Sequence, residues 1–72
     1  TAYQEVIPFM QRLLEEGIAQ GEFRSEMDAE AVASFVFSSI EGAIMASRLT
    51  HDNKHVHFAS KHIEQLLQSY RP

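Results

Sequence analysis

Residues 15–28 read EEGIAQGEFRSEMD and separate two long runs of apolar residues with helical spacing. Gly17 is expected to weaken the last turn of the first run, and Gly21 to end it, because glycine adopts the left-handed backbone conformation without strain. Asp28 precedes Ala-Glu-Ala, which supplies a side-chain oxygen for unpaired amides and an acid in the first turn. The stretch therefore predicts the end of one helix and the start of another.

The residues after the second glycine are expected to form a turn with one apolar contact. Phe23 should fold back as an apolar plug, while Glu22 and Arg24 stay in water. Ser25 is a competing start for the next helix, with Asp28 three residues on.

A first helix is predicted over about residues 2–20. Its apolar residues follow the spacing of one helical face, and glutamate, glutamine and arginine fill the opposite side. Pro8 lies inside this pattern and removes one backbone donor, so it either marks the first turn or kinks the helix. The predicted apolar face consists of Tyr3, Val6, Ile7, Met10, Leu13, Leu14 and Ile18.

A second helix is predicted over about residues 29–49. Its polar arc holds little more than Ser34, Ser38, Glu41 and Arg48. An ordinary surface helix carries one apolar stripe, but this one is apolar over roughly two-thirds of its circumference. We expect it to be buried on two sides, with a partner or another domain covering the second.

A third helix is predicted over about residues 54–70, after Asp52 or Asn53 as its cap. No strand-like alternation or internal repeat occurs in the chain. The predicted fold is all-α, with three helices in an antiparallel arrangement. The apolar stripe of the third helix consists of Val56, Ala59, Ile63, Leu66, Leu67 and Tyr70.

The length of 72 residues predicts one domain with a small core. A core of this size rarely contributes more than roughly 3–5 kcal/mol of net stability. Because the chain has no cysteine, disulfides and thiolate zinc sites are excluded, and oligomerisation or docking becomes the favoured source of stability. The chain begins at Thr1, which suggests a part of a longer protein, and its composition suits a reducing compartment such as the cytoplasm.

Charge and motif content exclude several functions. A formal charge of −4 without a basic block argues against phosphate contacts to nucleic acid from these residues. The second predicted helix is long enough to cross a membrane, but Glu41 lies near its middle, where a carboxylate costs about 2.5–3.5 kcal/mol. No serine–histidine pairing and no phosphate-binding glycine loop is present, so we predict no catalytic residue and no cofactor.

Four histidines, at positions 51, 55, 57 and 62, are the only candidate metal ligands. His51 and His55 are four residues apart, and imidazole suits zinc, copper or nickel. His57 projects away from the side shared by His55 and His62, and His51 precedes the predicted helix. We therefore expect solvated histidines and no metal.

The segment LLEEGIAQGEFRSEMDAEAVASFVFSSIEGAIMASRL resembles the C-terminal half of TetR/AcrR-family transcriptional regulators. The shared features are a Gly-x-x-x-Gly-Glu-hydrophobic-Arg turn from Gly17 to Arg24, an acid-capped apolar helix from Asp28, and a central Glu41-Gly42 pair. A final amphipathic helix over residues 54–70 closes the pattern. The resemblance covers almost all of the chain.

This resemblance implies a dimeric bacterial regulator whose C-terminal domain, here residues 1–72, binds a small apolar or amphipathic effector. DNA binding would come from an N-terminal helix-turn-helix outside these residues. The last two helices would form a four-helix bundle with their copies in a homodimer, which would explain the second apolar side of the second helix. Residues expected at or near the dimer interface are Gly42, Met45, Leu49, Phe58, His62 and Leu66; those on the pocket side are Met10, Leu14, Phe37 and Ile44.

Two alternatives remain open. One is an effector-free helical module that only joins chains or docks a partner. The other is a metal-responsive domain that uses His55 and His62.

Overall fold

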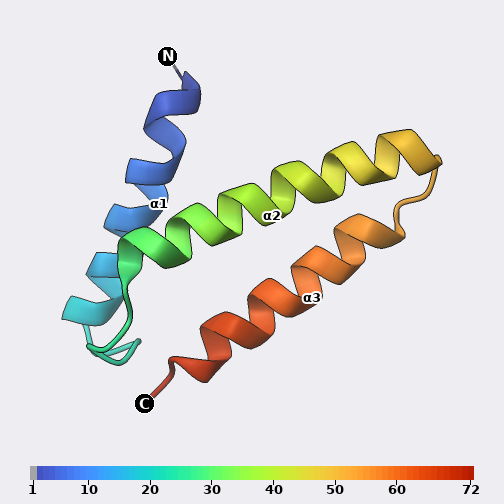
Figure 1. The fold of residues 1–72 in the computed structure, drawn as a ribbon. Helices are drawn as coiled ribbons and strands as arrows, with labels where there is room; N and C mark the ends of the chain where they lie inside the picture. Colours follow the sequence, from blue (N-terminus) through green and yellow to red (C-terminus); the bar gives the residue numbers. More distant parts are fainter. Residues whose placement is uncertain (1) are drawn as a thin grey trace.

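The computed structural model describes residues 2–72 and consists of three helices joined by two short loops (Figure 1). Helix α1 spans Ala2–Ala19, α2 spans Ala29–Thr50 and α3 spans Lys54–Ser69. Each boundary lies within one residue of its predicted position. The described part of the chain contains no strand, and the all-α, three-helix prediction is confirmed.

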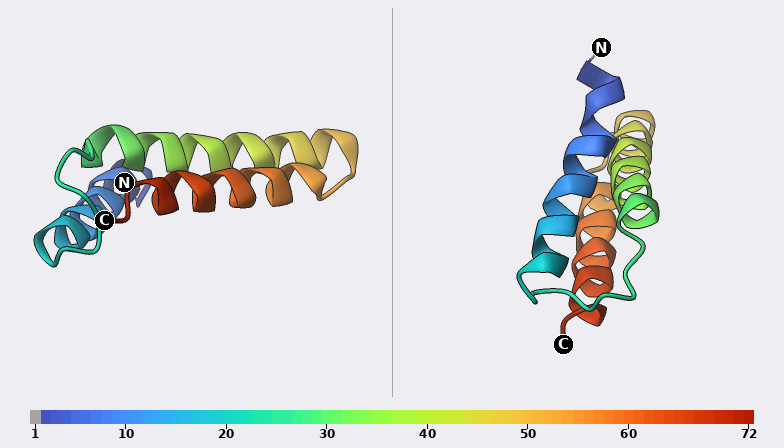
Figure 2. Two further views of the ribbon diagram at one scale, coloured as in Figure 1. Left: turned by 90° about the horizontal axis from the view of Figure 1, so that it is seen from below. Right: turned by 90° about the vertical axis from the view of Figure 1, so that its left-hand side faces the viewer.

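The helices α2 and α3 form an antiparallel hairpin and lie side by side along their length (Figures 1 and 2). Helix α1 packs across the N-terminal half of α2, close to the C-terminal end of α3. The turn that joins α2 to α3 projects well beyond α1. The outer half of the hairpin is therefore not covered by the first helix.

The α1–α2 turn ends the first helix in a complete Schellman motif. Gly21 has a φ of 80° and its amide donates to the carbonyl of Ile18 at 3.1 Å, while the amide of Glu22 donates to the carbonyl of Gly17 at 2.8 Å. This confirms Gly21 as the left-handed stop.

Gly17 does more than weaken the last turn of α1. A Cβ added at this position would lie 2.6 and 2.8 Å from two carbons of the Phe23 ring, closer than real side-chain contacts allow. Phe23 therefore folds back onto the helix, as predicted, in a place that is open only because residue 17 has no side chain.

Side-chain and backbone caps fix both ends of α2. Asp28 is the N-cap, and its Oδ1 accepts a hydrogen bond from the amide of Ala31 at 3.1 Å. At the other end His51 adopts the left-handed conformation, with φ 54° and ψ 41°, and its amide donates to the carbonyl of Ser47. Histidine thus occupies a position that usually favours glycine. In the loop before α3, Oδ1 of Asp52 accepts from the amide of Lys54 at 2.9 Å.

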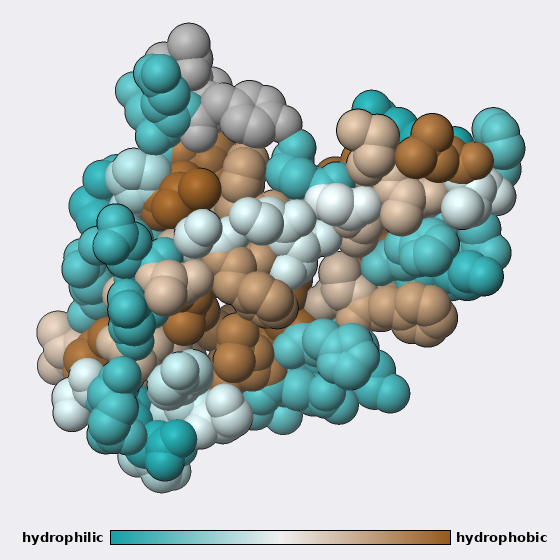
Figure 3. Space-filling view, in the orientation of Figure 1, coloured by the Kyte–Doolittle hydropathy of each residue, from teal (hydrophilic) through white to brown (hydrophobic). Residues whose placement is uncertain are grey.

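The core is small and is made largely of small side chains. The radius of gyration is 13.4 Å, whereas a compact domain of this length would have about 11 Å. No large side chain in the described part is fully buried. The space-filling view shows hydrophobic side chains where the helices meet and again at the far end of α2 (Figure 3). The buried apolar residues are Met27, Ala29, Val32, Ala33 and Ala43.

Helix α2 is buried on one side only within this chain. Phe35 on its other side is 48% exposed. The expectation of two buried sides is therefore not met by residues 2–72 themselves. By length and hydropathy α2 could also cross a membrane, but it packs against both other helices and carries Glu41 and Arg48.

We predict that Gly17→Ala lowers the free energy of unfolding by about 1–2 kcal/mol, because the new methyl group displaces the Phe23 ring. The matched comparison is Gly42→Ala, where the added Cβ meets nothing within 4 Å in the single chain; because Gly42 is also a predicted dimer-interface residue, the comparison is made on the monomer. That control should gain about 0.5–1 kcal/mol from helix propensity. Urea denaturation at the lowest workable protein concentration measures both; equal stability of Gly17→Ala and the parent would contradict the placement of the ring.

Candidate functional site

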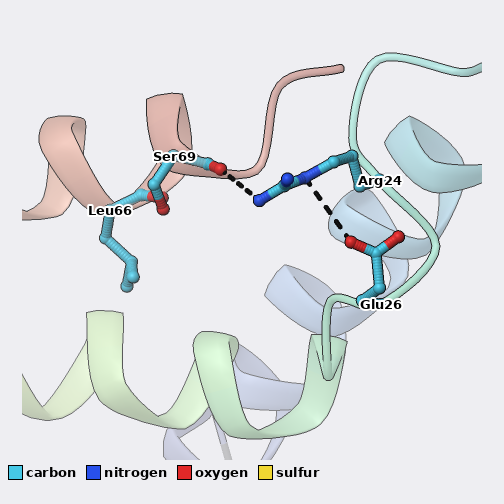
Figure 4. A network of polar contacts seen from close by, with 4 residues as sticks. All are labelled: Arg24, Glu26, Leu66 and Ser69. Carbon is cyan, nitrogen blue, oxygen red and sulfur yellow. Dashed lines mark hydrogen bonds and ion pairs between the residues drawn. The ribbon is translucent and has the colours of Figure 1, made fainter.

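Arg24 joins the α1–α2 loop to the end of α3 (Figure 4). Its guanidinium Nη2 donates to the carbonyl of Ser69 at 2.6 Å, and its backbone amide donates to the carbonyl of Tyr70 at 2.7 Å. Its Nε lies 3.5 Å from a carboxylate oxygen of Glu26. One residue thus makes two long-range hydrogen bonds, and a neighbouring acid orients its side chain.

The end of α3 needs such a partner. The last carbonyls of a helix accept no hydrogen bond from within the helix, and they carry partial negative charge. Helix α3 has no basic residue in its own last turn to interact with them. Arg24 supplies the missing donor and cation from the loop. The expectation that Arg24 stays in water is met only in part: its side chain is 47% exposed, but its guanidinium is bonded to the end of α3. No local pattern could have identified a partner that is 45 residues away.

The outward side of α2 carries a regular pattern of exposed residues that includes three predicted dimer-interface residues, Gly42, Met45 and Leu49, and three residues not predicted there. Six residues follow one another at alternating spacings of four and three, the repeat of a helix–helix interface, and all six are exposed. We call this set the outer face of α2. Ala31, Ser38 and Gly42 are its small residues, and Phe35, Met45 and Leu49 are its bulky residues. The outer face consists of Ala31, Phe35, Ser38, Gly42, Met45 and Leu49.

Five of the six residues predicted at the dimer interface are exposed in the single chain. Leu49 is 75% exposed, Met45 61% and Phe58 56%, and Gly42 and His62 are also exposed. The ring of Phe58 makes an edge-to-face contact with His55, at 6.2 Å between centroids. The sixth residue, Leu66, is half-buried.

An apolar pocket of about 140 Å³ lies where the three helices meet. Met10 and Leu14, two of the predicted pocket residues, contribute to its wall; Phe37 and Ile44 are not among its lining residues. Ligand sites usually have volumes of about 300–1,000 Å³. The apolar pocket is lined by Met10, Leu13, Leu14, Ala33, Val36 and Leu67.

A larger groove of about 440 Å³, which we call the loop groove, lies between the α1–α2 loop, α2 and α3. Phe23, Ile40, Ile63 and Leu67 are its apolar walls, and polar side chains of α3 and the C-terminal residues line its rim. A third hollow, of about 890 Å³, is lined only by residues between 4 and 13 of α1. A single helix face cannot enclose a ligand, so we regard that hollow as an open surface.

The four histidines do not form a metal centre in this structure. Within residues 2–72 no three His, Asp or Glu side chains come close enough together to hold an ion. His51 has a clear structural position instead, as the left-handed residue that ends α2.

Comparison with protein families agrees with this architecture. Residues 1–63 match the family described as tetracyclin repressor-like, C-terminal domain. The chain belongs to this family. Searches of curated proteins and of solved structures returned no match.

Family membership confirms the resemblance to TetR regulators and makes the chain part of a TetR-like regulator. The family is regulatory rather than enzymatic, and its members are soluble proteins, so α2 is best explained as a helix of a soluble domain.

We predict that Arg24→Met lowers the free energy of unfolding by about 1 kcal/mol, because the carbonyl of Ser69 loses a charge-assisted donor but stays accessible to water. Amide hydrogen exchange in the last turn of α3 should also become faster. The control is Arg71→Met, since the Arg71 side chain makes no hydrogen bond or ion pair within residues 2–72; its effect should stay within about 0.5 kcal/mol. Identical exchange in the two variants would contradict a role for Arg24 in holding α3.

Proposed function

We propose that this chain is the dimerisation and small-molecule-sensing domain of a ligand-responsive bacterial transcriptional regulator that acts in the cytoplasm. DNA recognition belongs to a helix-turn-helix outside residues 1–72. The proposal agrees with the matched family, whose members generally dimerise and bind small ligands. The observation that carries it is the outer face of α2.

The outer face suits a second copy of the same helix. Its four–three spacing keeps one stripe in register with a partner along the whole length of α2. Phe35, Met45 and Leu49 give this stripe apolar bulk, and Gly42 has open space around it, which allows close approach. Phe58 and His62 of α3 would extend the interface into a four-helix bundle.

Dimerisation would also bury apolar surface that the single chain leaves exposed. Among residues 4–72, only five apolar residues are buried, all of them small or medium-sized except Met27, and large apolar side chains remain in water. Burying an exposed Leu or Phe contributes about 1.5–3 kcal/mol per side chain. A second copy on the outer face would therefore stabilise both subunits.

Sensing would work as a population shift. An effector that binds one arrangement of the dimer more tightly than another moves the equilibrium by the difference in affinity. The two DNA-binding domains of the complete regulator would then change their spacing. Whether the regulator acts as repressor or activator depends on which arrangement fits the operator.

The second candidate is an effector-free dimerisation module. The size of the apolar pocket favours it, because about 140 Å³ is below the usual range for ligand sites. In this case the chain would dimerise equally well, and no small molecule would stabilise it.

We predict that the chain is a helical dimer at micromolar concentration and that Met45→Glu or Leu49→Glu weakens the dimer at least tenfold. Both side chains are exposed in the single chain, so the substitutions remove little from the folded subunit but place two carboxylates in the dimer interface. Light scattering at several concentrations, together with circular dichroism, measures mass and helicity.

The control for this experiment is His57→Glu, which adds the same charge at an exposed position in the first turn of α3. It should leave the dimer unchanged. A parent chain that stays a helical monomer would rule out dimerisation through the outer face and leave that face for another domain.

A further inference from the structure

The loop groove has the composition of a binding site rather than of a gap between helices. Its apolar walls come from three separate elements: Phe23 from the loop, Ile40 from α2, and Ile63 and Leu67 from α3. Its volume of about 440 Å³ lies within the usual range for small-molecule sites. The polar rim consists of Ser60, Glu64, Gln68 and Arg71.

Leu67 connects the loop groove with the apolar pocket. This side chain lines both cavities, so the purely apolar hollow among Met10, Leu14 and Val36 lies directly behind the wall of the groove. A ligand with an apolar chain would find apolar contacts in the groove and further apolar space beyond Leu67. Its polar end would have to remain at the rim, where solvent and charged groups are available.

The rim contains one acidic and one basic side chain, Glu64 and Arg71, and they differ in the hydrogen bonds that they make. Oε1 of Glu64 already accepts a hydrogen bond from the side-chain amide Nε2 of Gln68, at 3.3 Å. The guanidinium of Arg71 makes no hydrogen bond or ion pair within residues 2–72, although its backbone amide donates to the carbonyl of Gln68 and fixes its position. A planar guanidinium binds a carboxylate through two parallel hydrogen bonds. Arg71 is therefore the rim charge with no bonded side-chain partner within the described residues, and it favours an anionic head group.

We propose that the loop groove binds a small amphipathic carboxylate, with its apolar chain against Phe23, Ile40 and Ile63 and its carboxylate on Arg71. The idea that this ligand acts as a regulatory signal rests on the proposed function. The binding of the ligand does not depend on that function and can be measured on this chain alone. The ligand would touch the loop that carries Arg24 and so lie next to the contact between loop and α3.

The probes are octanoate, 1-octanol and octylamine, which share one apolar chain and differ in the head group. Two-dimensional NMR of the labelled chain should show octanoate binding with the largest shifts at Phe23, Ile63 and Leu67, at least tenfold more tightly than octanol. The chain has a formal charge of −4, so long-range electrostatics alone would favour octylamine. A preference for octanoate would therefore report a local cation.

Chain length tests the apolar walls. From hexanoate to octanoate the affinity should rise by about fourfold per methylene group, as expected when each added group is buried. An affinity independent of length would contradict burial in the loop groove.

Arg71→Gln should remove the preference for octanoate over octanol, and it is expected to fold normally because residue 71 is exposed and follows the last helix. The control is Arg48→Gln, an exposed arginine in the last turn of α2, which should bind octanoate as the parent does. Equal loss in both variants would mean that net charge, not Arg71, sets the preference.

Three results would overturn the proposal: tighter binding of octylamine, shifts that map to the outer face of α2 or to α1 residues 4–13, or no binding of any probe. None of these results would bear on the dimerisation proposal, which is tested separately by the measurement of solution mass. A dimer without octanoate binding would instead support the effector-free module.

Discussion

The structure depends on the space left by the missing side chain at position 17. The Phe23 ring occupies that space, and its seat on α1 determines where the following residue lies. Arg24 then donates to the carbonyls of Ser69 and Tyr70 at the end of α3, whose last turn has no basic residue of its own. The loop therefore fastens α1 to α3 at a point where the two helices share few other contacts. A methyl group at residue 17 would displace the Phe23 ring and, with it, the neighbouring Arg24 and its hydrogen bonds to the end of α3.

Small side chains also determine how α2 packs. Its buried side consists mostly of alanine and valine, which lets α1 and α3 approach closely but removes little apolar surface from water. Three larger apolar residues of α2, Phe35, Met45 and Leu49, are exposed instead. A chain built in this way has a well-defined shape and an incomplete core. The proposed assembly with a second copy would bury this exposed apolar surface.

Local signals predicted the helices, and nonlocal contacts escaped prediction. Gly21 and Asp28 act on backbone groups within a few residues, so their roles could be inferred from sequence, and the helix boundaries followed. The partner of Arg24 is distant in the chain, and no periodicity indicates it. The outer face of α2 was detectable from its four–three spacing, because its six residues fall on one side of a helical wheel. It did not stand out, since most of the circumference of α2 is apolar. Of the predicted pocket residues, Met10 and Leu14 line the apolar pocket, while Phe37 and Ile44 do not, because a wheel cannot decide which neighbour a face meets.

Phe23 links the fold to the candidate binding site. Its ring rests on Gly17 of α1 and is also a wall of the loop groove, beside Ile63 and Leu67 of α3. A molecule in the groove would press on the residue that positions α1, and the adjacent Arg24 would carry any displacement to the end of α3. Sensing in this domain would then need no long pathway. The residue proposed to contact the ligand, Phe23, and the residue that bonds to the end of α3, Arg24, are neighbours in one loop.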